Sequence, residues 1–215
     1  IEENENGTPT SIKFKNTEGF NFAFDLVDAL ADKEPEKLAM LHIAKDGTER
    51  RFTFKDIKKL SNQCANYFKS LGIKKGDRVM LVLKRHYQFW LCMMALNKLG
   101  VIVIPATNQL QEHDLEYRFQ AAGIKAILCT TDGDVANQVD MAAAKCPDLK
   151  IKIAVGEERE GWRNYDEECK LIRNKVSAIN YQDADDEKPY IRQGKYVYFG
   201  EYPQSIKADS VTITS

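Results

Sequence analysis

The stretch "RVMLVLKRHYQFWLCMMALNKLGVIVIPATNQL", Arg78–Leu110, decides the fold. It begins with a short apolar run, "RVMLVL", and ends with another, "VIVIP", and the amphipathic segment "YQFWLCMMALNKL" lies between them. Short runs that are apolar on both faces are typical of buried strands in a parallel sheet, and an intervening helix is the crossover that parallel strands require. We therefore predict a strand–helix–strand unit in which Gly100 ends the helix.

The same alternation continues toward the C-terminus. A helix is predicted over "QEHDLEYRFQAA" (111–122) and a strand over "KAILC" (125–129), followed by a helix over "DVANQVDMAAAKC" (134–146) and a strand over "KIKIAV" (150–155). Gly123 and Pro147 stand where the two helices should end. This order predicts an α/β domain with a mainly parallel sheet flanked by helices on both faces.

The N-terminal part of the chain predicts other elements. Residues 1–20 lack apolar periodicity and are expected to form a lead-in arm, and Asn21 is a helix cap residue. "LAMLHIA" and "RRFTF" flank the turn residues "KDG" and predict a hairpin. Thr53, with Asp56 three residues later, predicts a capped long helix that ends at Gly72.

Composition limits the function classes. The 215 residues include 31 Lys+Arg and 32 Asp+Glu, and this balance argues against a dedicated nucleic-acid binder, which needs a basic face. The longest apolar runs are far shorter than the ~20 residues of a membrane span. The five cysteines are widely spaced with no CxxC pair, and the start "IEENENGTPT" is polar and acidic, so we expect a cytoplasmic protein.

The order of several segments resembles one family. "FTFKDI", "GIKKGDRVML", "ALNKLGVIVIPATNQL", "DLEYRFQAAGIKAILC" and "REGW" are similar to successive parts of the N-terminal subdomain of the AMP-forming acyl-CoA synthetases, in their acetyl and medium-chain branch. The resemblance covers about residues 21–180, and it depends on the order of the segments because each one alone is weak.

The resemblance implies a reaction and its cofactors. In this family a carboxylate attacks the α-phosphate of ATP with Mg²⁺, giving an acyl-adenylate and pyrophosphate, and the thiol of CoA then displaces AMP. Transition-state charge of this kind requires a Gly-, Ser- and Thr-rich phosphate loop with a Lys. The family's loop, broadly "TSGTTGxPK", is absent from these 215 residues, as are the segments beyond it. We therefore expect no bound cofactor and no catalysis by this chain alone, and either a complementing polypeptide or self-association.

The last part of the chain changes in composition. Residues 183–188 form an acidic, turn-prone linker, and "KYVYFGEYP" and "DSVTITS" after it alternate loosely like strands. The pattern alone is equally compatible with a peripheral hairpin of the same domain. The family order favours a junction, so we divide the chain into an arm (1–20), an α/β subdomain (21–182) and a divergent Tyr-rich tail (183–215) with a short β-like character.

One loop is a candidate contributor to a site. Pro105, Ala106, Thr107, Asn108 and Gln109 follow a predicted strand and should lie at the carboxyl edge of the sheet, where such folds bind ligands. We predict a substrate-side loop here without assigning a role to any single residue, and we expect no catalytic, cofactor-binding or metal-binding residue.

Other polar and aromatic residues favour structural interpretations. His113 is expected at a solvated helix N-terminus, and Cys129 as a buried thiol at a strand end. The aromatic and Met residues of one helix, Phe89, Trp90, Met93 and Met94, are expected in the core more than in an acyl pocket.

Three functions remain open from the sequence. The first is a partial acyl-CoA synthetase, the second is a non-catalytic binding or assembly module, and the third is the product of a truncated or rearranged reading frame. The missing phosphate loop distinguishes the first from a complete enzyme.

Overall fold

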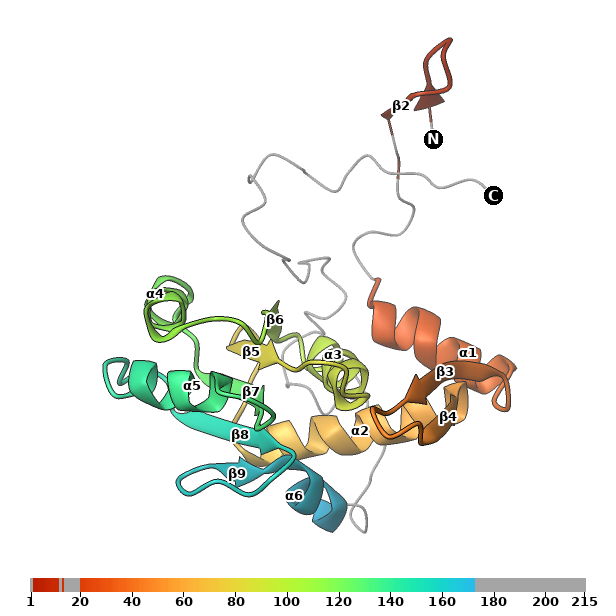
Figure 1. The fold of residues 1–215 in the computed structure, drawn as a ribbon. Helices are drawn as coiled ribbons and strands as arrows, with labels where there is room; N and C mark the ends of the chain where they lie inside the picture. Colours follow the sequence, from red (N-terminus) through yellow and green to blue (C-terminus); the bar gives the residue numbers. More distant parts are fainter. Residues whose placement is uncertain (1, 12, 14–19, 173–215) are drawn as a thin grey trace.

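A five-stranded parallel sheet forms the centre of the computed structural model, which describes residues 2–11, 13 and 20–172. Its strands are β5 (Arg78–Val82), β6 (Ile102–Pro105), β7 (Ala126–Thr130), β8 (Ile151–Val155) and β9 (Arg163–Asn164), in the spatial order β6-β5-β7-β8-β9 (Figure 1). Every neighbouring pair is parallel. The predicted α/β class is confirmed.

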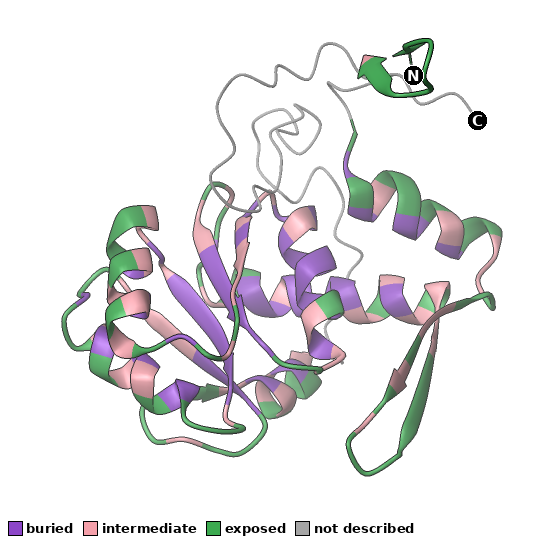
Figure 2. Cartoon of the chain, turned by 45° about the horizontal axis from the view of Figure 1, so that its top comes forward, coloured by how far each residue is buried: buried purple, intermediate pink, exposed green. Residues whose placement is uncertain are grey.

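Helices cover both faces of this sheet. One face carries α2 (Phe54–Ser70), α3 (Gln88–Lys98) and α6 (Tyr165–Leu171), and the other carries α4 (Glu112–Ala122) and α5 (Val135–Ala143). Along β5, Val79 and Leu81 face the first layer while Met80 and Val82 face the second, and all four side chains are fully buried. The central strands are accordingly coloured largely as buried in Figure 2. This explains why the strands are continuously apolar, since each lies between two helical layers.

The predicted helix boundaries at Thr53 and Gly123 are confirmed in detail, whereas α5 ends at Ala143, before the predicted stop at Pro147. The Thr53 side chain accepts from the Asp56 N–H, and the Asp56 carboxylate accepts from the Thr53 N–H. Gly123 ends α4 in the left-handed region at φ 58°, and a Cβ there would lie 2.7 Å from the Arg78 guanidinium. Only glycine meets both requirements without strain.

The predicted hairpin is also confirmed, but it stands outside the main sheet. β3 (Leu38–Ile43) and β4 (Glu49–Thr53) form their own antiparallel pair, which projects from the body of the domain (Figure 2). Leu38, Leu41 and Ile43 of β3 are exposed.

Three features differ from the sequence predictions. The arm contains a small hairpin of β1 (Glu2–Glu3) and β2 (Pro9–Ser11), because the Asn4 side chain accepts from two N–H groups of the turn. The helix after Asn21 begins as a π-helix, η1 (Phe22–Asp28), before α1 (Ala29–Lys33). The two-residue strand β9 is too short to produce a pattern. The predicted tail, 183–215, lies outside the described residues.

The helix α3 also corrects one prediction. Met93 and Met94 are buried as expected, but Trp90 is 55% exposed and was wrongly assigned to the core. Trp90 lies in the first turn of α3, where it lines a cavity together with residues of β3, and its ring packs edge-on against Phe89.

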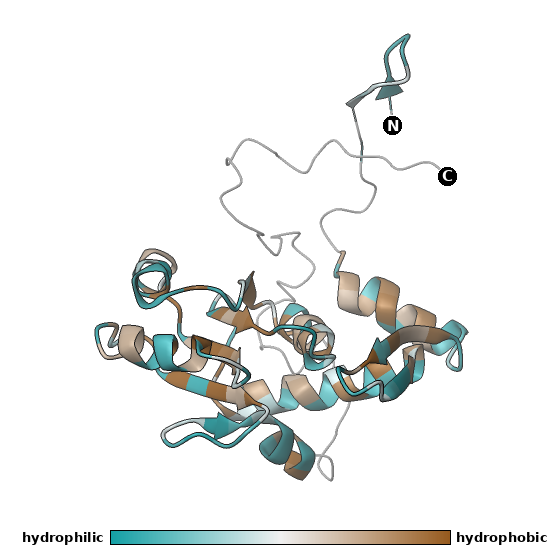
Figure 3. Ribbon diagram, viewed as in Figure 1, coloured by the Kyte–Doolittle hydropathy of each residue, from teal (hydrophilic) through white to brown (hydrophobic). Residues whose placement is uncertain are grey.

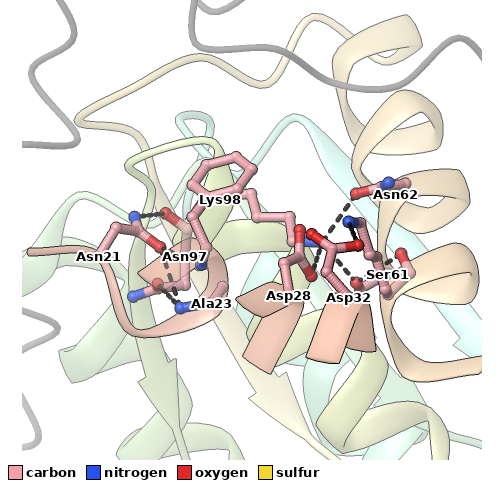
Figure 4. Close-up of polar contacts among 10 residues, drawn as sticks. Asn21, Ala23, Asp28, Asp32, Ser61, Asn62, Asn97 and Lys98 are labelled. Carbon is pink, nitrogen blue, oxygen red and sulfur yellow. Dashed lines mark hydrogen bonds and ion pairs between the residues drawn. The ribbon is translucent and has the colours of Figure 1, made fainter. Parts of the chain in front are cut away.

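A fully buried lysine holds the N-terminal helix to the domain. The Lys98 ammonium, at the end of α3, donates to Asp28 at 2.8 Å, to Ser61 at 2.9 Å and to Asn62 at 2.7 Å (Figure 4). It also lies 5.5 Å from the centre of the Phe24 ring. All three ammonium donors therefore have an acceptor, which is the condition for burying such a charge.

A second set of contacts fixes the start of the same helix. The Asn21 side chain accepts from the Ala23 N–H at 3.0 Å and donates to the Asn97 carbonyl at 3.1 Å (Figure 4). The Asn97 side chain in turn accepts from Ala23 at 3.2 Å. Neighbouring residues of α3 thus hold both ends of η1.

Burial lowers the pKa of Lys98 and raises the pKa of Asp28, and their mutual attraction opposes both shifts. Removing only one partner leaves the other buried without its counter-charge, which typically costs about 3–5 kcal/mol. We expect Lys98→Met to lower the free energy of unfolding by this amount. The double variant Lys98→Met/Asp28→Asn should lower the free energy of unfolding by less than Lys98→Met alone.

Urea unfolding followed by circular dichroism would measure these changes. Lys58→Met is the matched control, because Lys58 pairs with an exposed Asp32 and should cost less than about 1 kcal/mol. A double variant that loses the sum of the two single losses would contradict the coupling between Lys98 and Asp28.

Candidate functional site

The carboxyl edge of the sheet is the candidate functional site. In the sheet, β6 lies on one side of β5, and β7 and then β8 lie on its other side. The order in which the strands are added therefore changes direction between β5 and β7. In open α/β sheets of this order, ligands bind outside the carboxyl ends of the strands at that point. The loops that follow β5, β6 and β7 therefore form the candidate site.

The predicted substrate-side loop lies at this edge. Pro105 is the last residue of β6 and pairs with Leu81, and the Ala106 N–H donates to the Leu81 carbonyl at 2.9 Å. Thr107 and Gln109 are exposed and Asn108 is half-buried. The backbone of the loop is fixed to β5 while its polar side chains remain accessible, and its role in binding stays a prediction.

Two polar pairs join the loops after β5 and β7. Lys84 forms an ion pair with Asp132 at 2.8 Å, and His86 Nε2 lies 2.8 Å from the Thr130 hydroxyl. The Asp132 N–H also donates to that hydroxyl at 3.1 Å. Sequence reasoning missed this contact, although a signal existed: both loops follow buried strands that the βαβ pattern predicts to be parallel.

Electrostatics keeps these pairs in defined charge states. Burial lowers the pKa of His86, so a neutral imidazole is favoured in the folded chain. The Lys84 ammonium donates to the Asp132 carboxylate and lowers its pKa. The edge therefore presents one fixed ion pair and one neutral, hydrogen-bonded imidazole.

The other candidate residues have structural positions. Cys129 is buried, and desolvation raises its pKa to about 12, so it remains a thiol and not a nucleophile. His113 is exposed on the first turn of α4, as expected. His42 lies in β3, and its Nε2 is 2.8 Å from the Arg85 carbonyl.

The loop after β8 is fixed by a compact charged cluster. Asp140 of α5 accepts from Arg159 Nε at 2.8 Å and from the Trp162 indole at 2.9 Å, and it forms an ion pair with Lys152. Lys152 and Arg159 also lie over the Trp162 ring. This cluster holds the loop to α5, while Glu157, Glu158 and Glu160 of the same loop are exposed.

The described residues contain neither a cluster of metal ligands nor a membrane-spanning helix. Within residues 2–11, 13 and 20–172, no group of His, Cys, Asp and Glu side chains is arranged to hold a metal ion. Over the same residues, no helix combines the length and the apolarity that crossing a bilayer requires.

The fold and the edge together define a class, a doubly wound α/β domain with its polar loops at the switch point. Comparison with known proteins gives the family. The sequence profile described as AMP-binding enzyme matches residues 27–196, more than half of the chain. The chain belongs to this AMP-binding enzyme family, and the family predicted from the sequence is confirmed.

The curated relatives are acyl-CoA synthetases. Rat "Acyl-coenzyme A synthetase ACSM5, mitochondrial" is 35% identical over 184 residues, covering 82% of this chain and 32% of the relative. Human "Acyl-coenzyme A synthetase ACSM3, mitochondrial" is 35% identical over 194 residues, covering 81% and 33%. The chain thus spans about a third of the length of the relatives that it matches. Because these relatives are named as mitochondrial, the predicted cytoplasmic location is contradicted.

Solved structures share the fold. The anthranilate CoA ligase AuaEII in complex with anthranoyl-AMP superposes with a TM-score of 0.60 at 21% identity, covering 73% of this chain and 31% of that one. A Brucella canis acyl-CoA synthetase gives 0.61 at 20% identity, with 75% and 28% covered. At these identities the likeness concerns the fold alone.

The lowered pKa of His86 predicts a pH-dependent stability. The unfolded chain takes up a proton near the ordinary pKa of about 6.5, whereas the folded imidazole resists it. The stabilising contribution of His86 to the free energy of unfolding is therefore present above that pH and is lost as the pH falls. We expect His86→Gln to destabilise the chain more at about pH 7.5 than at about pH 5.5.

Chemical denaturation of both proteins at the two pH values tests this. His113→Gln, at an exposed imidazole, is the control and should follow the parent at both. If the difference between parent and His86→Gln grows at low pH, the assignment of a buried neutral imidazole is wrong.

Proposed function

We propose that this chain supplies the N-terminal subdomain of an ATP-dependent acid–CoA ligase, acting on carboxylic acids through an acyl-adenylate. The observation that carries the proposal is the family match, which extends over about four-fifths of the chain in the curated relatives. The names of those relatives, and the anthranoyl-AMP bound to one structural neighbour, give the reaction class.

In this proposal the chain contributes a rigid surface to a larger active site. The loop Pro105–Gln109 forms part of the substrate side, because β5 holds its backbone while Thr107, Asn108 and Gln109 keep accessible side chains. ATP, Mg²⁺ and CoA would be held largely by segments that these 215 residues do not contain. The domain division at residues 20 and 182 remains part of the proposal.

A non-catalytic binding or assembly module is the second candidate. The exposed apolar residues of β3 favour it, because Leu38, Leu41 and Ile43 are 48%, 43% and 58% exposed on a strand that projects from the domain. Surfaces of this kind mark contacts with other polypeptides. The two candidates differ in whether adenylate chemistry returns when the remaining segments are supplied.

The chain alone should show no ATP–pyrophosphate exchange with carboxylic acids from acetate to octanoate. The transferring phosphoryl group would have no preorganised donors, since the family's Gly-rich loop is not among the 215 residues. Exchange of radiolabelled pyrophosphate into ATP is the measurement. Robust exchange by the isolated chain would overturn the assignment of an incomplete site.

Adding a polypeptide made of the remaining two-thirds of the rat relative should restore exchange. In the restored enzyme, Asn108→Ala is expected to lower the rate about tenfold or more, because misplaced substrate groups lose rate steeply. Gln120→Ala, an exposed change on α4, is the matched control. Equal rates for both variants would remove the loop from the substrate side, and failure to restore exchange would favour the binding module.

A further inference from the structure

The hairpin β3–β4 has an open groove beside its β3 edge. A cavity of about 410 Å³ is lined by Met40, Leu41 and His42 and, across from them, by residues 83–87 of the turn after β5 and by Phe89 and Trp90 of α3. Successive residues of a strand point to opposite faces. A cavity lined by three in a row therefore reaches the edge of the strand.

That edge has no strand neighbour among the described residues, where β3 pairs only with β4. The Ala44 N–H donates to the Thr48 carbonyl at 2.9 Å, which fixes the pattern of the pair. In an antiparallel pair, backbone groups alternate between facing the partner and facing away. By this alternation, Leu41 and Ile43 direct their N–H and C=O groups away from β4, toward the open side.

The groove has a single sign of charge. Its charged lining residues are Lys84 and Arg85, its histidines are His42 and His86, and no carboxylate lines it. Asp132 neutralises Lys84, whereas Arg85 is exposed and has no ion-pair partner in the described part of the chain. The corresponding groove beside β4 is mixed, since Asp166 lines it together with Arg50 and Arg51.

The floor and outer rim of the β3 groove are apolar. Met40, Phe89 and Trp90 line it, and Trp90 is 55% exposed. The side of the hairpin that faces solvent continues this apolar character through the exposed Leu41 and Ile43. Figure 3 colours much of β3 as hydrophobic. An occupant must therefore supply apolar side chains as well as backbone hydrogen bonds.

From these observations we propose that the β3 edge binds an extended, acidic segment of a separate polypeptide as a third strand. Its backbone pairs with Leu41 and Ile43, its acidic side chains face Arg85, and its alternate apolar side chains lie on the opposite face, beside the exposed side chains of Leu41 and Ile43. Addition of a strand at an open edge is an established mode of peptide recognition. The inference concerns the hairpin alone and does not depend on ligase activity.

The test uses the full 215-residue chain and a labelled peptide of eight residues that alternates Glu and Val. Fluorescence anisotropy should show saturable binding, and amide hydrogen exchange should show new protection at Leu41 and Ile43. A peptide with Lys in place of Glu should bind at least about tenfold more weakly. Of two peptides N-methylated at alternate amides, one should lose binding and the other should retain it.

Two charge reversals separate local from overall charge. Arg85→Glu should weaken binding of the Glu–Val peptide about tenfold or more, because like charges then meet across the groove. Lys59→Glu makes the same change in net charge at an exposed position on α2, outside the groove, and should have little effect. Circular dichroism of both variants confirms that the fold is retained.

Several outcomes would overturn the proposal. They are the absence of saturable binding, equal binding of the Glu and Lys peptides, or protection that spares Leu41 and Ile43. Protection of these amides in the peptide-free chain would also overturn it. Concentration-dependent protection of this kind would identify a second copy as the occupant, and concentration-independent protection would identify the chain itself.

Discussion

The arrangement of the N-terminal elements depends on one charge that has no access to water. Lys98 is 0% exposed, and its ammonium finds acceptors on η1 and on α2. Burying an ammonium without acceptors would cost more free energy than the net stability of a typical domain. These acceptors must therefore remain in place whenever Lys98 is charged. The buried ammonium therefore fixes η1 against α2 and α3, and through Gly100 the same helix leads into β6 and the candidate loop.

Such a charge specifies an arrangement more than it stabilises one. Apolar packing at the same place would stabilise the docked η1 equally or more, but it would allow η1 to slide and rotate against α2 and α3. The three directed hydrogen bonds of Lys98 are satisfied in only one orientation of η1. η1 is a π-helix, and both of its ends meet α3, where Asp28 reaches Lys98 and Asn21 and Ala23 reach Asn97. Here the unusual backbone geometry accompanies contacts that only one register satisfies.

The sequence predicted elements that carry their own periodicity and missed contacts between distant residues. Leu115 and Phe119 lie one helical turn apart, and both are buried as the pattern of α4 requires. Lys98 gives no such signal, because a lysine in the last turn of a helix is usually solvated and its acceptors lie 36 to 70 residues away. The pairing of His86 with Thr130, 44 residues apart, is hidden for the same reason. The position of the loop Pro105–Gln109 was predictable because it follows from strand direction alone, whereas its polar neighbours depend on which strands are adjacent.

One side chain, Tyr87, joins the hairpin to the turn that borders the candidate site. A two-stranded hairpin is marginally stable alone, so β3 and β4 need contact with the body of the domain. Tyr87 provides it, with ring centres 5.5 Å from His42 and 5.2 Å from Phe52, and with the Arg50 guanidinium 5.7 Å from its ring. Tyr87 directly follows His86 in the turn after β5, and the Arg85 carbonyl in that turn lies within hydrogen-bonding distance of His42. A strand that binds at the β3 edge therefore contacts the same turn that holds Lys84 and His86 at the carboxyl edge. Because packed interiors have few alternative arrangements, the contacts of Tyr87 fix the position of the hairpin relative to the turn that holds Lys84 and His86.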